Sequence, residues 1–388
     1  MLSLIISESG VVFLTKRNNL LIFILTIGVF GILNTEMGVI GLLPSISEHF
    51  NVSISTAGLA VSLFAIAIAV AGPTLPLLFS GIDRKKIMLL VLGVFTLGNI
   101  ASVFISNFTI LLIVRIILGL FHPIYCSMAF TVAASSVKPE EAPKAVSKVF
   151  IGVSAGMIAG VPIASFIDSA FSYEMAMAFF AIVTAIMLIA ALIFVPSMPV
   201  KERLSYGTQL TVLKKPILWI SIVTVVLLNA SVFGVYSYIA EYLETVTQMS
   251  SNIISLTLFV FGGANIIGNI VAGRILTNSP IKSILTFPLL LSVVYILLFF
   301  TGEFAVPMVI ITFLWGILAG GIMANINQYL ISSSAPEAPD FANGLFISQM
   351  GAQYVVLVGI LSLILGLVTI LLRTYMLTPT KQLSKKVS

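Results

Sequence analysis

The chain has 388 residues, of which 59% are hydrophobic and 9% are charged, whereas a soluble domain carries about 25% charged residues. This composition excludes a soluble globular protein, because such a fold cannot bury that much apolar surface. The net charge of +5 does not indicate nucleic-acid binding, since the basic residues form short clusters between apolar stretches and not one stripe. With Cys126 as its one cysteine, the chain has no disulfide framework and no Cys/His metal-binding pattern.

The first 15 residues form a short apolar segment that is interrupted by Ser7, Glu8, Ser9 and Gly10. No basic residue precedes the apolar run, whereas a cleaved secretory signal begins with a positively charged region. We therefore expect residues 1–15 to be a disordered or interfacial leader.

Eleven longer apolar runs follow, separated by short polar or charged segments. A helix needs about 20 apolar residues to cross a hydrocarbon core about 30 Å thick, and a strand of a membrane barrel would alternate apolar with polar residues. The pattern therefore predicts an all-α integral membrane protein. The expected spans cover residues 20–43, 56–80, 87–106, 109–133, 145–167, 173–195, 217–240, 252–273, 283–301, 304–331 and 353–373.

The connections between these spans alternate in charge. Lys and Arg near the ends of short loops resist translocation, so the basic connections are expected in the cytoplasm. The intervening connections carry acidic residues without Lys or Arg; these are Glu48, Asp168, Glu174, Glu241, Glu244 and Glu303. The alternation predicts a multi-pass protein of the cell membrane with its N-terminus in the cytoplasm.

The longest polar connection divides the expected spans into two groups. We expect an N-terminal six-helix half at 16–200, a cytoplasmic linker at 201–215, a C-terminal half at 216–376 and a basic cytoplasmic tail at 377–388. The halves look related, because Gly81-Ile82-Asp83-Arg84-Lys85-Lys86 follows the second span and Ala272-Gly273-Arg274 follows the eighth. Two parallel six-helix repeats are a recurrent transporter architecture.

A series of short motifs carries a resemblance to a known family. In chain order they are Thr35-Glu36, Gly81 to Lys86, Arg115 with Gly119, His122 and Ser127, and Gly152 to Pro162. In this order and spacing, the chain resembles the major facilitator superfamily over nearly its whole length, and within it the drug:proton antiporter branch with its arabinose-efflux-permease-like members. The resemblance implies two pseudo-symmetric six-helix bundles.

The family has twelve helices, and this chain departs from that number. Residues 338–346 resemble the usual start of the eleventh helix and residues 347–353 its usual end, so the membrane-crossing middle is missing. About a dozen moderately apolar residues remain, which is too few to cross at about 1.5 Å per residue. We expect an eleventh helix truncated near 341–351 by an internal deletion. The basic tail favours a C-terminus inside the cell, whereas an eleventh crossing would put it outside.

Three ionisable residues are candidates for proton coupling. Glu36 is the carboxylate that lies well inside an expected span, where ionisable groups are costly and usually functional. Arg115 cannot deprotonate and must find acceptors nearby, and His122 titrates near neutral pH. The alternatives are a carboxylate reached by outside water, an arginine that only braces the helices, and a neutral histidine bonded to a carbonyl.

Two motifs are candidates for gating. By the family resemblance, the loop with Gly81, Asp83 and Arg84 holds the two halves together in one state of the transport cycle; a purely topogenic basic cluster is the alternative. The glycines of the fifth span form a smooth helix face that allows close approach of another helix, and we expect this contact to lie where the halves move, with ordinary packing as the alternative. This motif comprises Gly152, Gly156, Gly160 and Pro162.

Polar and aromatic residues at membrane depth are candidates for substrate binding. With the many Phe and Met residues, they predict a mostly apolar pocket with few hydrogen-bonding groups, which suits lipophilic compounds. A lipid-facing or packing role is the alternative for any one of them. The candidates are Tyr125, Asn229, Tyr236, Tyr238, Asn265, Asn325 and Gln328.

The sequence thus predicts a secondary active transporter, with proton-coupled efflux of small lipophilic drugs or metabolites as the leading function. The proton gradient would supply the energy, and no cofactor is expected. The expected partners are a small-molecule substrate and the lipid bilayer, with no nucleic acid and a monomeric state. The alternatives are an importer, a sugar- or nucleoside-type exporter of the same fold, and a transport-defective deletion variant. An enzyme is not indicated, because the motifs of a nucleophile with its base or of a phosphate-binding loop are missing.

Overall fold

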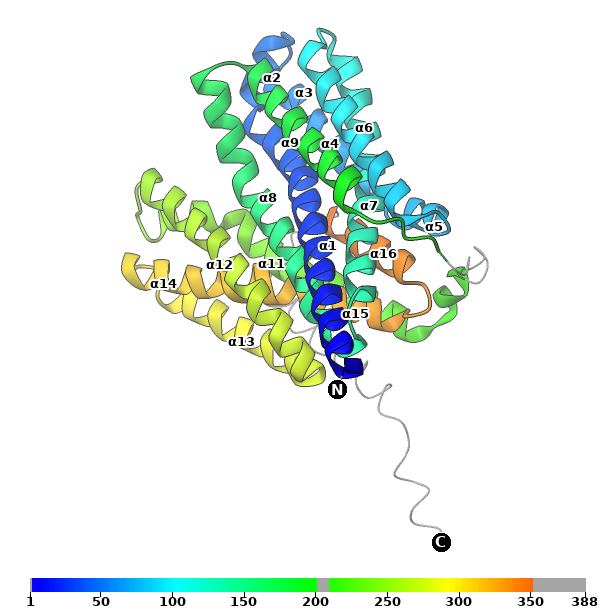
Figure 1. Ribbon diagram of the computed structural model, residues 1–388. Helices are drawn as coiled ribbons and strands as arrows, with labels where there is room; N and C mark the ends of the chain where they lie inside the picture. Colours follow the sequence, from blue (N-terminus) through cyan, green and yellow to red (C-terminus); the bar gives the residue numbers. More distant parts are fainter. Residues whose placement is uncertain (1, 201–208, 352–388) are drawn as a thin grey trace.

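The computed structural model describes residues 2–200 and 209–351, and within these ranges all regular structure is helical. Ten helical segments in the described ranges are long and apolar enough to cross a membrane. They pack into the two-lobed bundle of Figure 1. The expected spans before residue 335 are all present, and the span expected at 353–373 lies outside the described residues.

The N-terminal half contains six of these segments. They are α1 (Leu2–Gly41), α3 (Ile54–Ala57) with α4 (Leu59–Ala71), α6 (Arg84–Phe104), α7 (Phe108–Ser135), η1 (Pro139–Glu141) with α8 (Ala142–Ala170), and α9 (Tyr173–Phe194). Short helices α2 (Leu43–His49) and α5 (Leu75–Phe79) lie between them.

The C-terminal half contains four. They are α11 (Pro216–Thr245), α12 (Ser251–Asn278), α13 (Pro280–Phe300), and a continuous segment made of α14 (Ala305–Trp315), η3 (Gly316–Met323) and α15 (Ala324–Ser334). The short 3-10 helix η2 (Thr211–Lys214) precedes α11, and α16 (Pro339–Gly351) follows α15.

Side-chain caps begin several of the N-terminal helices. Asp83, Asn107 and Ser172 precede α6, α7 and α9, and each side chain accepts a hydrogen bond from a backbone N–H of the first turn. Such caps satisfy donors that would otherwise lack partners at a helix start. The polar residues between the apolar runs therefore determine where these helices begin.

Two boundaries differ from the sequence expectation. The structure extends α1 back to Leu2, so residues 2–15 are helical and not disordered, and the expectation of an interfacial leader stays a prediction. One glycine, Gly10, costs a helix only about 1 kcal/mol. The second span is not continuous to residue 80, because a turn at residues 72–74 separates α4 from α5. Pro73 lies in this turn and lacks the N–H that would continue the helical bonding.

A π-helix forms the middle of the tenth span. At η3, Gly316 and Gly321 let the chain approach α12 so closely that an added methyl group would meet the carbonyl of Phe261 or the Cα atom of Gly268. Wider π turns are uncommon and often occur at functional sites. Here the π-helix places the backbone of the tenth span against α12.

The two halves meet along two seams. Helix α8 of the N-terminal half packs against α12, and α16 packs against α7, α4 and α5. Figure 1 shows α16 lying beside the N-terminal half, although it follows the C-terminal spans in the chain. The described part of α16 has 13 residues, which is about 20 Å at 1.5 Å per residue. The truncation expected near 341–351 stays a prediction, because the residues that follow Gly351 lie outside the described ranges.

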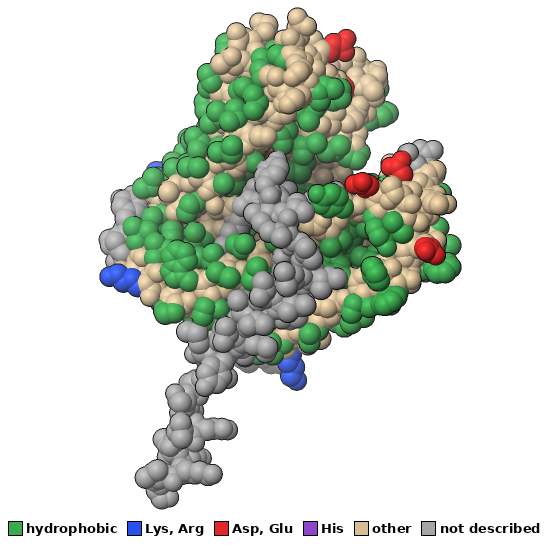
Figure 2. Space-filling model, turned by 180° about the vertical axis from the view of Figure 1, so that it is seen from behind, with side chains coloured by type: hydrophobic (Ala, Val, Ile, Leu, Met, Phe, Trp, Pro, Cys, Tyr) green, Lys and Arg blue, Asp and Glu red, His purple; other side chains and the backbone are tan. Residues whose placement is uncertain are grey.

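On the face that Figure 2 shows, acidic side chains lie mainly toward the top and basic ones toward the bottom. We call these the acidic end and the basic end. Large apolar side chains cover the surface between them, and Phe104, Phe299 and Phe300 are more than 70% exposed. An exposed apolar belt of this kind is the surface that lipid tails contact.

Candidate functional site

A buried pair of ionisable side chains lies inside the N-terminal half. The Nε2 atom of His122 on α7 lies 3.1 Å from the Oε2 atom of Glu36 on α1, and the two side chains are 5% and 17% exposed. The Sγ atom of Cys126 lies 3.8 Å from the same histidine nitrogen. The sequence predicted Glu36 and His122 as separate candidates, and the fold brings their side chains into contact.

Arg115 lies on the same helix as His122 and holds the backbone around Glu36. Its Nε donates to the Ala60 carbonyl at 3.0 Å, and its Nη1 donates to the Thr35 carbonyl at 3.3 Å. Its guanidinium also lies 4.1 Å from the centre of the Phe64 ring, a cation–π contact. Arg115 therefore finds acceptors in two backbone carbonyls, one of which belongs to the neighbour of Glu36 in the chain.

Several buried polar atoms around this pair have no hydrogen-bond partner among the described residues. They include Nη2 of Arg115, Nδ1 of His122 and the hydroxyl of Tyr125. An unpartnered buried donor or acceptor usually marks a site of water or ligand binding.

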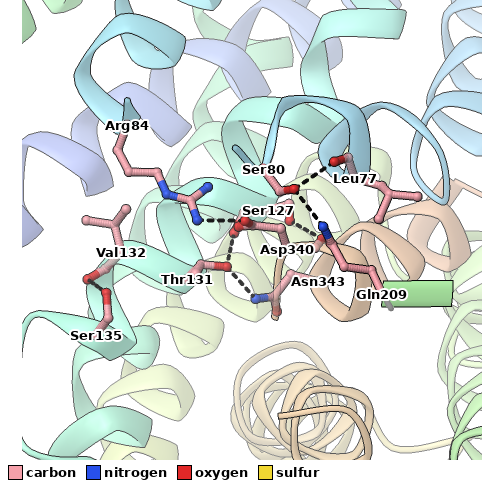
Figure 3. Close-up of polar contacts among 10 residues, drawn as sticks. All are labelled: Leu77, Ser80, Arg84, Ser127, Thr131, Val132, Ser135, Gln209, Asp340 and Asn343. Carbon is pink, nitrogen blue, oxygen red and sulfur yellow. Dashed lines mark hydrogen bonds and ion pairs between the residues drawn. The ribbon is translucent and has the colours of Figure 1, made fainter. Parts of the chain in front are cut away.

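A second cluster joins the halves at the basic end (Figure 3). Arg84, the first residue of α6, places Nη2 2.7 Å from Oδ2 of Asp340 at the start of α16, with side chains 16% and 6% exposed. The hydroxyl of Ser127 donates to the Asp340 carbonyl at 2.6 Å. The loop of Gly81, Asp83 and Arg84 thus contacts the opposite half, which a purely topogenic cluster does not require.

Asp83 fixes this loop from within the N-terminal half. Its side chain caps α6 through the N–H of Lys86, and it accepts a 2.7 Å hydrogen bond from the Ser197 hydroxyl. Slight desolvation favours the neutral acid, but these hydrogen bonds outweigh it and lower the pKa of Asp83 below its ordinary value. The carboxylate therefore stays charged and keeps its hydrogen bond to the first turn of α6. This bond fixes the start of the helix, where Arg84 lies.

The other seam is joined by amides and hydroxyls. Asn269 on α12 donates to the Phe150 carbonyl at 3.2 Å and to the Ser154 hydroxyl at 2.8 Å. Its Oδ1 accepts from Asn325 at 2.7 Å, and Asn325 in turn accepts from the Ser147 hydroxyl at 2.7 Å. These neutral groups are buried and link α8 to both α12 and α15.

The expected substrate residues separate into three groups. Tyr236 and Tyr238 are exposed by 43% and 53%, and the Tyr236 ring lies beside Phe261 and Trp315. Tyr125 is completely buried against Gly28. The amides are engaged with protein groups: Asn229 with Asn327, Asn265 with the backbone of η3, Asn325 with Asn269, and Gln328 with Asn343.

The expected location of the glycine stripe is wrong. Gly152, Gly156 and Gly160 face α1, and a methyl group at these positions would meet Thr26, Leu33 or Gly38 of the same half. The stripe packs two helices within one half, because the opposite face of α8 carries the polar and bulky groups that meet α12. Pro162, which follows the stripe inside α8, is exposed.

Sequence reasoning missed several residues of the contact between the halves. Asp340, Asn343 and Ser348 lie on α16, which the sequence marked only as a damaged helix, and Ser348 donates to the Ala69 carbonyl at 2.7 Å. The carboxylate of Asp340 beside an apolar run was the signal that could have identified it.

Comparison with known proteins assigns this architecture. The model of the Major Facilitator Superfamily matches residues 25–356. The chain belongs to the major facilitator superfamily. The resemblance stated from the motifs is thereby confirmed, and the chain is a membrane transporter of this superfamily and not an enzyme.

Its relatives in this superfamily include transporters from several bacteria. It is 28% identical over 344 residues to the uncharacterized MFS-type transporter YtbD of Bacillus subtilis (strain 168), covering 87% of this chain and 86% of that protein. It is 28% identical over 323 residues to the inner membrane transport protein YdhP of Escherichia coli (strain K12), covering 83% of each. A "Probable sugar efflux transporter" of Pasteurella multocida (strain Pm70) is 27% identical over 313 residues, covering 80% of this chain and 77% of that protein.

Solved structures of the superfamily share the fold. The transporter FucP in the outward conformation matches with a TM-score of 0.71 at 15% identity, covering 92% of this chain and 98% of that one. The proton:xylose symporter XylE, bound to 6-bromo-6-deoxy-D-glucose, matches with a TM-score of 0.71 at 13% identity, covering 94% and 96%.

Proposed function

We propose that this superfamily member is a proton-coupled exporter of small lipophilic compounds. The observation that carries the proposal is the Glu36–His122 pair at membrane depth, with Arg115 bonded beside it. Ionisable groups inside a membrane are costly, and those of transporters commonly form proton relays. The Glu36 carboxylate can pair with His122 when it is ionised and can bind a proton when it is neutral. Proton coupling requires a group with two such states.

The proton step follows from charge. When Glu36 is ionised, it attracts His122 and α1 is held against α7. A proton that arrives from outside neutralises Glu36 and weakens this attraction, so α1 and α7 can shift relative to each other. Release of the proton to the cytoplasm restores the pair. One proton enters the cell for each such cycle, and the reverse movement of substrate gives export.

The seams support a rocking movement of the halves. The interhalf bonds of Arg84, Ser127 and Asn269 lie toward the basic end or at middle depth. With the basic end in the cytoplasm, this arrangement closes the cytoplasmic side and leaves the substrate region open outward. Breaking these bonds would open the site inward for loading.

A cluster of three aromatic rings, of which only Tyr236 is exposed, supports the proposed substrate class. Tyr236, Phe261 and Trp315 lie with ring centroids 4.6–6.2 Å apart, and the Tyr236 side is exposed. Such a platform binds flat apolar or cationic molecules by stacking and cation–π contact. Glu36 would add attraction for a cation.

The test is transport into inside-out membrane vesicles that carry the protein. With an acidic lumen, uptake of lipophilic cations and neutral drugs should exceed that of vesicles without the protein, and an uncoupler should abolish the difference. Equal uptake with and without the uncoupler would contradict proton coupling.

Sugar export is a second candidate. Buried amide atoms of Asn229 and Asn327 lack partners among the described residues, and an amide pair suits a hydroxyl group, which both donates and accepts. The relative from Pasteurella multocida is named as a probable sugar efflux transporter. Radiolabelled sugars in the same vesicles separate the two candidates, since a sugar exporter would accumulate them and leave the drugs outside.

A further inference from the structure

The end of the linker between the halves lies against the contact at the basic end. Gln209 is 2% exposed, and Val212 within η2 is completely buried. A tether that only connects two bodies has no need to bury its side chains. Residues 209–215 therefore form a fixed segment, which we call the strap.

The strap is attached to the N-terminal half at its first residue. The Nε2 atom of Gln209 donates to the Ser80 hydroxyl at 2.9 Å, and that hydroxyl donates to the Leu77 carbonyl at 2.7 Å. Ser80 ends α5, and four residues later Arg84 begins α6 and pairs with Asp340. Figure 3 shows both contacts side by side.

The strap is attached to the C-terminal half at its last residues. The Trp219 indole on α11 donates to the Leu213 carbonyl at 2.7 Å, and Lys215 forms an ion pair with Glu337. Partial burial opposes the charge on Glu337, but the bond from Lys215 outweighs it and lowers the pKa of this carboxyl. Glu337 lies three residues before Asp340, so the strap joins the same two loops as the Arg84–Asp340 pair.

We infer that the strap is part of the gate: Gln209 on Ser80 reinforces the closed basic end, and this bond must break for the halves to separate there. The C-terminal attachment remains in place, because it is continuous with α11. The inference rests on the proposed rocking movement, which assigns a gating role to the basic end.

The experiment reports on opening and not on transport. Cys126 is replaced by alanine, and Ser127→Cys provides a reporter thiol at a position that is completely buried in the contact. Inside-out vesicles expose the basic end to a membrane-impermeant thiol reagent. Arg84→Ala in this background should raise the labelling rate and establishes that the reporter senses opening.

Gln209→Ala should raise the labelling rate by roughly 2- to 10-fold, the effect of one neutral hydrogen bond. Ser80→Ala should also raise the labelling rate, and the double variant should fall short of the product of the two single effects, because both variants remove the Gln209–Ser80 bond. Leu210→Ala, at an exposed neighbouring position of the strap, is the matched control and should label like the parent.

The two ideas fail in different ways. If Arg84→Ala opens the reporter but Gln209→Ala and Ser80→Ala do not, or if their effects add fully, the strap has no part in the gate. If Arg84→Ala leaves labelling unchanged while Gln209→Ala raises it, the strap closes this end and the role proposed for Arg84 is wrong. If no variant changes labelling, the basic end is not a gate and both proposals are overturned.

Discussion

At the scale of single residues, the informative groups are charges and amides that cannot remain unpaired in a membrane protein. Glu36 was identifiable from sequence, because a carboxylate within a long apolar run has few explanations. Its partner was not, since His122 is 86 positions away and only the packing of α1 on α7 brings them to 3.1 Å. The same holds for Arg84 and Asp340, which come from opposite halves.

Replacing Glu36 by glutamine should abolish proton-driven uptake into inside-out vesicles, with at least a roughly tenfold loss expected when a charge-dependent step is removed. The amide keeps the shape and cannot take up a proton at neutral pH. Glu48→Gln, at an exposed position of α2, is the control and should transport like the parent. If proton-driven uptake survives Glu36→Gln, proton coupling depends on a residue other than Glu36.

Breaking the Arg84–Asp340 pair from one side should destabilise the protein more than removing both charges. Arg84→Ala leaves a buried carboxylate unpaired, at a cost of about 3–5 kcal/mol, whereas Arg84→Ala with Asp340→Asn leaves no charge behind. Thermal unfolding of the purified protein measures the difference. Lys86→Ala, at an exposed position two residues further along α6, should leave the Tm unchanged. A double variant as unstable as the single one would show that the charges do not interact.

At the scale of helices, close packing depends on glycine at a few positions. A methyl group on Gly156 would meet the Leu33 Cβ atom and the Phe30 carbonyl of α1, whereas one on Gly93 of α6 would meet nothing within 4 Å. The sequence showed that small residues recur every four positions in the fifth span. The sequence did not show which helix these small residues face, because a row of small residues allows close approach of any neighbouring helix.

Gly156→Ala should therefore lower thermal stability, with overpacking costing about 1–3 kcal/mol. Gly93→Ala is the matched control and should be neutral or slightly stabilising, because alanine favours a helix over glycine by about 1 kcal/mol. Both variants are compared by thermal unfolding in the same detergent. Equal stability of the two would mean that α1 and α8 have room to separate.

At the scale of the whole molecule, α16 joins the two halves at the basic end. The described part of α16 holds Asp340, Asn343 and Ser348, which reach Arg84, Thr131 and Ala69 of the other half. The residues that resemble the start of the eleventh helix therefore supply contacts between the two halves. A transport-defective variant could still keep this gate, so gating and transport are tested separately.

The acidic end, which we propose faces out of the cell and opens there, should be reached by reagents added outside the cell. In a Cys126→Ala background, Tyr236→Cys should react with an impermeant thiol reagent added to intact cells, because this side chain is 43% exposed in a state whose basic end is closed. Trp315→Cys, at a completely buried position behind it, should react at least roughly tenfold more slowly. Labelling of Tyr236→Cys only from the cytoplasmic side would reverse the proposed orientation.

Sequence alone determined that the chain is a helical membrane protein and where most of its spans lie. These follow from local quantities, namely the length of apolar runs and the charge of the segments between them. Tertiary structure alone decided the partners: Glu36 with His122, Arg84 with Asp340, the glycine stripe with α1, and the linker with Ser80. Pairing depends on how helices from distant parts of the chain pack. The residue pattern within one helix shows which of its faces carries polar or small residues, but not which helix packs against that face.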